Sequence, residues 1–179
     1  MALIKENELI PETLLEVAKK MVVAARTAPK ARGLSTLETA ILTGRDIQDL
    51  ARCMHEIGEA ENNKIFLRDA RNVGESADVV VLLGTSVKAL GLAVCGFCGF
   101  RDCAHKNEYP EVPCSFNTGD LGIALGSAVA VAMDHRVDNR IMYTLGYAAR
   151  KLGILGEDVR VIYGVPLSAS SKNPFFDRK

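Results

Sequence analysis

Apolar residues recur at helical spacing in three segments of the chain. The segments 11–25, 43–57 and 65–73 place apolar side chains at intervals of three and four residues, which predicts three amphipathic helices. Pro11 suits the first turn of the first helix, where its missing N–H costs nothing. That helix is expected to end before Pro29, because the residue before a proline avoids the helical region.

Short apolar runs predict strands between and after these helices. The runs 37–42 and 158–165 are each interpreted as a strand. The run 77–84 is the clearest one, because its continuous β-branched residues indicate a central strand buried on both faces. Helices and strands do not alternate strictly, which favours an α+β fold over a doubly wound sheet.

The second half of the chain contains a long loop and two further predicted helices. Residues 91–120 are rich in Gly, Cys and Pro and show no periodicity, which predicts a loop. Residues 121–133 are apolar on every side, which predicts a helix buried all round. Asp138 and Asn139 are expected to cap another helix, which Gly153 ends.

The loop holds four of the five cysteines, with the spacing C-x2-C-x4-C-x10-C: Cys95, Cys98, Cys103 and Cys114. Two cysteines two residues apart can put both sulfurs on one metal, and the intervening glycines let the backbone turn inward. Four thiolates suit an iron–sulfur cluster or a structural zinc ion. The alternative is a set of reduced cysteines that only pack. Cys53, alone on a predicted helix, is interpreted as a core residue.

An iron–sulfur cluster, of the 4Fe-4S type, is favoured over zinc. Zinc loops usually close two C-x2-C pairs or use histidine, whereas the second pair here is split into Cys103 and Cys114. The neighbours of the first pair are glycine and phenylalanine, which shield sulfur from water. His105 is an alternative ligand, and zinc stays open as the alternative metal.

Composition limits the remaining classes of function. A chain of 179 residues with 48% hydrophobic residues is expected to form one domain, residues 1–179, with its own core. A net charge of zero gives no general basic footprint for nucleic acid. The first ten residues contain Lys5, Glu6 and Glu8, and no uncharged stretch reaches the length of a membrane span. We therefore expect a cytoplasmic protein, in which clustered cysteines indicate metal or redox chemistry.

Three segments resemble the nitroreductase-type flavoproteins. The segment 25–33 resembles the Ala-Pro turn that ends an amphipathic helix in that fold, and 156–166 resembles its last core strand. The tail 168–178 resembles its basic end that contacts the FMN phosphate. With the cysteine loop, the chain resembles the uncharacterised, ferredoxin-domain-containing relatives of nitroreductases over most of its length.

This resemblance implies a central, mostly antiparallel sheet flanked by helices and a two-fold homodimer that holds FMN at its interface. The phosphate contacts are then expected from basic and hydroxyl residues that match the pattern: Arg26, Lys30, Arg32, Ser170 and Lys172, with Arg178 as a further cation. One departure is that no arginine precedes the first helix, where nitroreductases carry an Arg-Ser-x-Arg segment. Gly122 and Gly126 provide a small-residue face that would allow close approach of a second helix.

Two functional hypotheses follow. The first is an FMN-dependent oxidoreductase of nitroreductase type, in which an iron–sulfur cluster relays electrons. The second is a non-enzymatic binding or assembly module with structural zinc at the four cysteines and no flavin. The sequence names no catalytic residue, substrate or redox partner.

Overall fold

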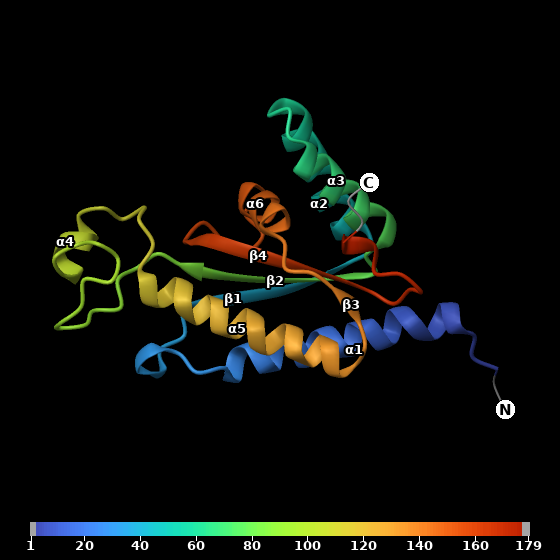
Figure 1. Ribbon diagram of the computed structural model, residues 1–179, viewed down its shortest axis with the longest axis horizontal. Helices are drawn as coiled ribbons and strands as arrows, with labels where there is room; N and C mark the ends of the chain where they lie inside the picture. Colours follow the sequence, from blue (N-terminus) through green and yellow to red (C-terminus); the bar gives the residue numbers. More distant parts are fainter. Residues whose placement is uncertain (1–2, 177–179) are drawn as a thin grey trace.

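The computed structural model describes residues 3–176, in which a four-stranded sheet separates two layers of helices (Figure 1). The strand order is β1-β2-β4-β3, and every neighbouring pair is antiparallel. The strands are β1 (Leu37–Thr43), β2 (Val79–Ser86), β3 (Asp138–Asn139) and β4 (Val159–Ser168). The predicted α+β fold with an antiparallel sheet is confirmed.

Each face of the sheet is covered by its own helices (Figure 1). On one face lie α1 (Glu6–Thr27) and α5 (Ser115–Asp134), which pack lengthwise against each other. On the other face lie α2 (Arg45–Ala60), α3 (Lys64–Ser76) and α6 (Tyr143–Lys151). A short helix, α4 (Cys103–Asn107), lies in the cysteine loop, which projects beyond one end of the sheet. Two 3₁₀ turns complete the chain, η1 (Ala31–Gly33) and η2 (Pro174–Phe176).

Strand β2 is buried on both faces, as its continuous apolar run predicts. Val80 and Leu82 point into the core under α2, α3 and α6. Val79, Val81 and Leu83 point into the core under α1 and α5. Alternate residues of one strand therefore supply both cores, as the two-residue period of a strand requires.

The contact between α6 and β4 depends on a missing side chain. A β-carbon added at Gly146 would collide with the carbonyl group of Ile162. Gly146 is buried, so the helix backbone lies directly on the strand there. Such close approach of two backbones is possible only for glycine.

The predicted starts of α1 and α5 differ from the structure. Helix α1 begins at Glu6 rather than at Pro11, and its first turn contains Glu6 and Glu8, whose charges favour a helix N-terminus. Helix α5 begins at Ser115, so the loop predicted for 91–120 is shorter and also contains α4. The polar residues in the first turns of α5 hide its helical period from the sequence.

The predicted cap at Asp138 and Asn139 is wrong. These two residues form β3 and pair with Ser168 and Leu167 of β4, and α6 begins only at Tyr143. Their polar side chains suit a helix start equally well, and the pairing with a strand distant in sequence decides between the two structures.

Helix α5 is not buried on every side, contrary to the prediction. Leu121, Ala124 and Ala128 pack into the core, whereas Gly122 and Gly126 are exposed. A β-carbon at either glycine would meet no atom within 4 Å. The small residues therefore do not serve packing inside the subunit.

By length and composition, α5 is the one helix of the described chain that could cross a membrane. In the structure it lies along α1 and one face of the sheet, as a core helix does.

Candidate functional site

The turn after α1 gathers three of the predicted cofactor-binding residues. The ammonium group of Lys30 donates to the carbonyl oxygens of Ala25 (2.9 Å), Arg26 (3.0 Å) and Ala28 (2.7 Å). It therefore satisfies the carbonyls at the C-terminal end of α1. Burial, and then the charge of Arg26, lower the pKa of Lys30, and the carboxylate of Asp120 partly opposes this.

Arg26, in the last turn of α1, and Arg32, in the turn that follows, are both exposed residues. Arg26 donates from Nη1 to the Ser35 hydroxyl oxygen at 2.9 Å. Arg32 donates from Nη1 to the Leu90 carbonyl at 3.2 Å, which ties the turn to the start of the cysteine loop. Arg32 has φ 57°, in the left-handed region that non-glycine residues seldom adopt. Each guanidinium has five N–H donors, so most donors of both arginines remain available.

Helix α5 holds the turn from the other side. Both carboxylate oxygens of Asp120 accept the backbone N–H of Ala31, at 3.2 and 3.0 Å. Asp120 is buried, and this bond fixes the turn over the start of α5.

A cavity of about 410 Å³ lies between this turn, the cysteine loop and α5. Its walls come from three elements: Pro29, Lys30 and Ala31 of the turn, Phe97 of the loop, and Ser115, Phe116, Gly119, Asp120 and Ile123 of α5. The Phe97 and Phe116 rings stack with their centroids 5.6 Å apart and their planes 9° apart. Phe97 stands between Cys95 and Cys98 in the sequence. The predicted metal loop and the predicted flavin turn therefore share one cavity.

The four loop cysteines are free thiols. Cys114 is buried, and Cys95, Cys98 and Cys103 are partly buried. Within residues 3–176, no three His, Cys, Asp or Glu side chains lie close enough together to hold one metal ion. The donor set fits a tetrathiolate centre by its chemistry, and full ligation requires the loop to draw the sulfurs closer than they lie here.

The first cysteine pair lies on a turn built from glycine. Gly96 and Gly99 have φ values of 117° and 87°, and the N–H of Gly99 donates to the Gly96 carbonyl at 2.9 Å. A side chain at either position would strain the turn. The glycines noted in the sequence thus allow the backbone to reverse around Cys98.

Two residues that the sequence analysis did not single out attach the helices of the other two cysteines, Cys103 and Cys114, to the end of the sheet. Lys106 on α4 donates to the Val87 carbonyl at 2.6 Å. Asn117 on α5 donates from Nδ2 to the carbonyls of Ser86 (3.1 Å) and Lys88 (2.8 Å). All three carbonyls belong to the segment 86–88, where the chain leaves β2.

The spacing of these two residues was a usable signal. Lys106 follows Cys103 by three residues and Asn117 follows Cys114 by three. Residues three apart share a helix face, so each cysteine lies one turn before the side chain that attaches its helix to the end of β2.

Ser170 and Lys172 lie at the other end of α5. The backbone N–H and hydroxyl of Ser170 donate to Asp138 Oδ2 at 3.0 and 2.9 Å, and the hydroxyl also contacts the Lys172 carbonyl at 2.7 Å. Asp138 follows the C-terminal end of α5, whereas Asp120 lies near its start, about 20 Å away along the helix axis. A single chain therefore does not bring Ser170 and Lys172 to the turn after α1. Arg178 lies outside the described residues.

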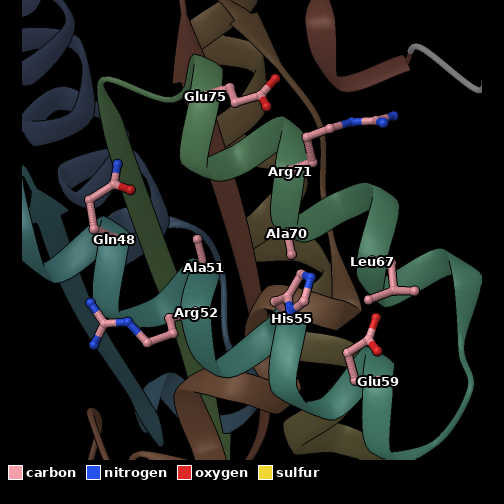
Figure 2. A pocket seen from close by; sticks show the side chains of 9 residues that line it. All are labelled: Gln48, Ala51, Arg52, His55, Glu59, Leu67, Ala70, Arg71 and Glu75. Atoms are coloured by element: carbon pink, nitrogen blue, oxygen red, sulfur yellow. The ribbon is translucent and has the colours of Figure 1, made fainter.

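A larger cavity, about 600 Å³, lies between α2 and α3 on the opposite face of the sheet. Figure 2 shows the methyl groups of Ala51 and Ala70 between the helices and the His55 ring directed toward them. Its charged side chains are of both signs, with Arg52 and Glu59 among them. It contains none of the residues that the sequence singled out as ligands.

Comparison with known proteins gives a family and a fold. The family described as uncharacterized proteins containing a ferredoxin domain (DUF2148) matches residues 111–178, a segment that includes Cys114. An uncharacterized protein from Archaeoglobus fulgidus is 39% identical over 183 residues, covering 98% of this chain and 97% of its own length.

Solved structures of the nitroreductase type share the fold. A nitroreductase family protein from Clostridium novyi NT has a TM-score of 0.60 and 13% identity, covering 94% of this chain and 77% of its own. A nitroreductase with bound FMN from Desulfitobacterium hafniense DCB-2 has a TM-score of 0.60 and 14% identity, covering 88% and 78%. The predicted nitroreductase-like fold is confirmed by these likenesses.

Proposed function

Because the chain belongs to the family of uncharacterized proteins that contain a ferredoxin domain, we propose that it is a redox protein with an iron–sulfur cluster and a flavin. The ligands of the cluster are the thiolates of Cys95, Cys98, Cys103 and Cys114. The FMN lies at an interface of two copies, beside the turn after α1. In this proposal the flavin supplies the hydride or electron chemistry, and the cluster passes electrons to or from it.

The observation that carries the proposal is the shared cavity. Phe97 of the cysteine loop and Lys30 of the turn line the same space, so a flat aromatic ligand there would lie directly against the metal loop. The stacked rings of Phe97 and Phe116 offer an apolar aromatic wall. Electron transfer between a flavin and an iron–sulfur cluster requires the two cofactors to lie close together, as a shared cavity would allow.

The residues around the cavity have distinct tasks in this proposal. Arg26 and Arg32 do not line the cavity themselves, but they flank its turn and would supply guanidinium N–H groups to a phosphate, which cannot be buried without such donors. Lys30 does not add a donor, because its ammonium group already serves three carbonyls of α1. Asp120 keeps the turn in place through the Ala31 N–H.

A second copy of the chain completes the site. The exposed glycines of α5 permit a close helix–helix contact across a two-fold axis. Two such helices would run antiparallel if the axis is perpendicular to them, and the start of one would lie beside the end of the other. The tail of the second copy, with Ser170 and Lys172, would then approach the turn after α1. This homodimer is part of the proposal, as is a reducing compartment such as the cytoplasm, where the free thiols would persist.

The visible spectrum of protein purified without oxygen tests both cofactors. We expect flavin bands near 450 nm and a broad iron–sulfur shoulder near 400 nm, with iron and sulfide present by chemical analysis. Light scattering should give twice 19.3 kDa. Colourless protein with stoichiometric zinc would contradict the proposal and favour the non-enzymatic zinc module. One observation favours this second candidate. Lys30 donates its hydrogen bonds to carbonyl groups of α1, and no arginine precedes α1 in the sequence, so two expected phosphate donors are absent.

Arg32→Gly tests the flavin separately from the metal. Glycine adopts the φ of 57° without strain, so the variant removes the guanidinium and keeps the turn. We expect FMN binding, measured by fluorescence quenching, to weaken by about 1.5–3 kcal/mol, the usual worth of a charged hydrogen bond. Arg45→Ala on α2 is the control, because Arg45 is exposed on the other face of the sheet. Equal affinity in wild type and Arg32→Gly would remove Arg32 from the site.

A further inference from the structure

A smaller cavity, about 190 Å³, lies where α6 packs against β4 (Figure 1). One wall is a single stripe of α6, because Tyr143, Gly146, Tyr147 and Arg150 follow one another at helical spacing. The other wall is the segment 160–163 of β4. This cavity shares no residue with the one beside the cysteine loop, so it is a separate site.

The strand wall of this cavity is an open edge of the sheet. In the described chain, β3 pairs only with Leu167 and Ser168 of β4, and Met142 bridges to Gly164. Alternate residues of a strand direct their backbone groups to the same side. Since Gly164 bonds to Met142 on the side away from β2, the N–H of Ile162 also points to that side, where no strand of the described chain pairs with it. The edge therefore offers a backbone donor at the cavity.

Two arginines from different elements line the cavity, Arg150 of α6 and Arg160 of β4. Within residues 3–176, neither guanidinium group has a hydrogen bond or a carboxylate within 4 Å. Glu157 and Asp158 are the carboxylates nearest to Arg160 in sequence, but neither lines the cavity, and Asp158 pairs with Lys88 at 3.6 Å. The helix dipole favours a cation in the last turn of α6, but it does not account for Arg160 on the strand.

Three of the four tyrosines of the chain line the same cavity: Tyr143, Tyr147 and Tyr163. The first two are 50% and 53% exposed. The buried ring of Phe66 meets both of them edge-on, with centroids 5.8 and 5.7 Å away. Two aromatic rings are thus held in place beside the arginines, and each keeps about half of its surface free for a ligand.

The cavity continues into a second hollow of about 270 Å³, which Tyr147, Arg150 and Lys151 line. Tyr147 and Arg150 line both hollows, so one ligand can occupy the two together. The combined site has room for an aromatic ring as well as an anionic group.

We propose that this tyrosine–arginine cavity binds a nucleoside phosphate. Guanidinium groups match the geometry of phosphate oxygens, so Arg150 and Arg160 hold the phosphate, and the N–H of Ile162 adds a donor. The base stacks on Tyr147, which lines both hollows. A single nucleotide fits better than a nucleic acid strand, because a strand needs a longer track of cations and the chain has no net positive charge.

Isothermal titration calorimetry of the full chain tests the proposal, with ADP, adenosine and inorganic phosphate as probes. Arg150→Ala and Arg160→Ala each remove one guanidinium, and Tyr147→Leu removes the stacking ring. Arg45→Ala is the matched control, because Arg45 is an exposed arginine of α2 that lines neither hollow. Both cavity arginines are exposed, so the variants should keep the circular dichroism spectrum of the wild type.

We expect ADP to bind about tenfold or more tightly than adenosine or phosphate, because only ADP uses both the arginines and the ring. Each arginine variant should weaken ADP binding by about tenfold or more, as loss of a charged hydrogen bond does. Tyr147→Leu should weaken ADP by about fivefold or more and leave phosphate unchanged. Arg45→Ala should bind ADP as the wild type does. If ADP binds no more tightly than phosphate, or if both arginine variants bind ADP normally, the inference is overturned.

FMN is also an aromatic phosphate, so the two proposed sites must be told apart. Arg32→Gly should weaken FMN binding and leave ADP binding unchanged, and excess ADP should not displace FMN. Displacement of FMN by ADP, with both ligands lost in Arg160→Ala, would mean one shared site and would overturn the inference. Protein that binds ADP but no FMN would contradict the proposed function and support this inference, which requires neither the flavin nor the metal.

Discussion

The two faces of the sheet treat their buried polar groups differently. Under α2, α3 and α6, the buried carboxylate of Asp69 has three partners: Arg68 at 2.6 Å, the Thr144 hydroxyl at 2.8 Å and Arg140 at 3.8 Å. At the cysteine end of the other face, Lys106 has one acceptor, and His105 and Asn117 each leave an atom unpaired. Apart from Asn72, the buried polar side-chain atoms described under α2, α3 and α6 all have hydrogen-bond partners, so we call this face the complete face. At the cysteine end some of these atoms have no partner, so we call that region incomplete.

Glycines show the same contrast. Gly146 of α6 is pressed against β4, with no room for a β-carbon, whereas Gly122 and Gly126 of α5 face open space. Cavity size does not distinguish the two regions in the same way. The larger cavity lies between α2 and α3, on the face whose buried polar groups have partners, and the smaller one lies at the cysteine loop (Figure 2). Unmet hydrogen-bonding capacity therefore marks the end of the molecule where the cofactors are proposed to bind, whereas cavity volume does not.

Two cysteine variants should separate the regions most sharply. If Cys98 is a ligand of the proposed cluster, Cys98→Ser should abolish iron and sulfide without changing the stability of the metal-free protein by more than about 0.5 kcal/mol. Cys53→Ser should do the reverse. Cys53 is 5% exposed in the core under α2, where an unpaired hydroxyl costs about 1–3 kcal/mol, and the iron content should stay unchanged.

Chemical analysis of anaerobic preparations and urea denaturation of the metal-free forms measure the two effects. The comparison fails if Cys98→Ser unfolds the metal-free protein or if Cys53→Ser removes the metal. Neither result is expected, because the two described core clusters include Cys53 and none of the four loop cysteines.

The sequence predicted the complete region well and the incomplete region only in part. The periodicity of α2 and the apolar run of β2 result from burial within the chain itself. Both elements lie within about three residues of the predicted ranges 43–57 and 77–84. Cys53 was likewise correctly assigned to the core. These features depend on local pattern, which a single sequence displays.

The errors fall where contacts distant in sequence decide the structure. Asp138 and Asn139 became a strand because β4 offers an edge, and the exposed side of α5 looks like core in composition alone. The buried position of Lys106 could not be predicted for the same reason, since its hydrogen bond is to the carbonyl of Val87, nineteen residues earlier. Composition shows which residues are present and not which of them lack a partner.

Gly146→Ala should be the most damaging change on the complete face. The added methyl group meets the Ile162 carbonyl, and neither backbone can yield without separating α6 from β4. We expect a loss of about 3 kcal/mol or more in the free energy of unfolding, the upper range for overpacking. Urea denaturation followed by circular dichroism measures it. A loss below about 1 kcal/mol would mean that α6 can move away from β4 at little cost. The close contact at Gly146 would then contribute little to the stability of the fold.

Gly126→Arg tests the open face of α5. The side chain points into free space within one subunit, so the fold should persist with its circular dichroism spectrum unchanged. In the proposed dimer the same side chain would prevent close approach of the two helices, and the protein should become a monomer of 19.3 kDa in light scattering. Glu56→Arg on the exposed side of α2 is the control and should leave the dimer intact. A Gly126→Arg protein that is still dimeric would place the interface elsewhere.

The smallest effect concerns the helix start that orients Cys103. Asp102 accepts the backbone N–H of His105 at 2.8 Å, and this bond, followed by the hydrogen bond from Arg101, lowers the pKa of Asp102 below 3.8. The cap is therefore fully formed above pH 3.8 and is lost as the pH falls through the lowered pKa. The His105 amide resonance of the metal-free protein should move with a midpoint below 3.8. Asp102→Asn should abolish this transition, because asparagine caps without titrating. A wild-type midpoint at or above 3.8 would show that the cap is open in solution.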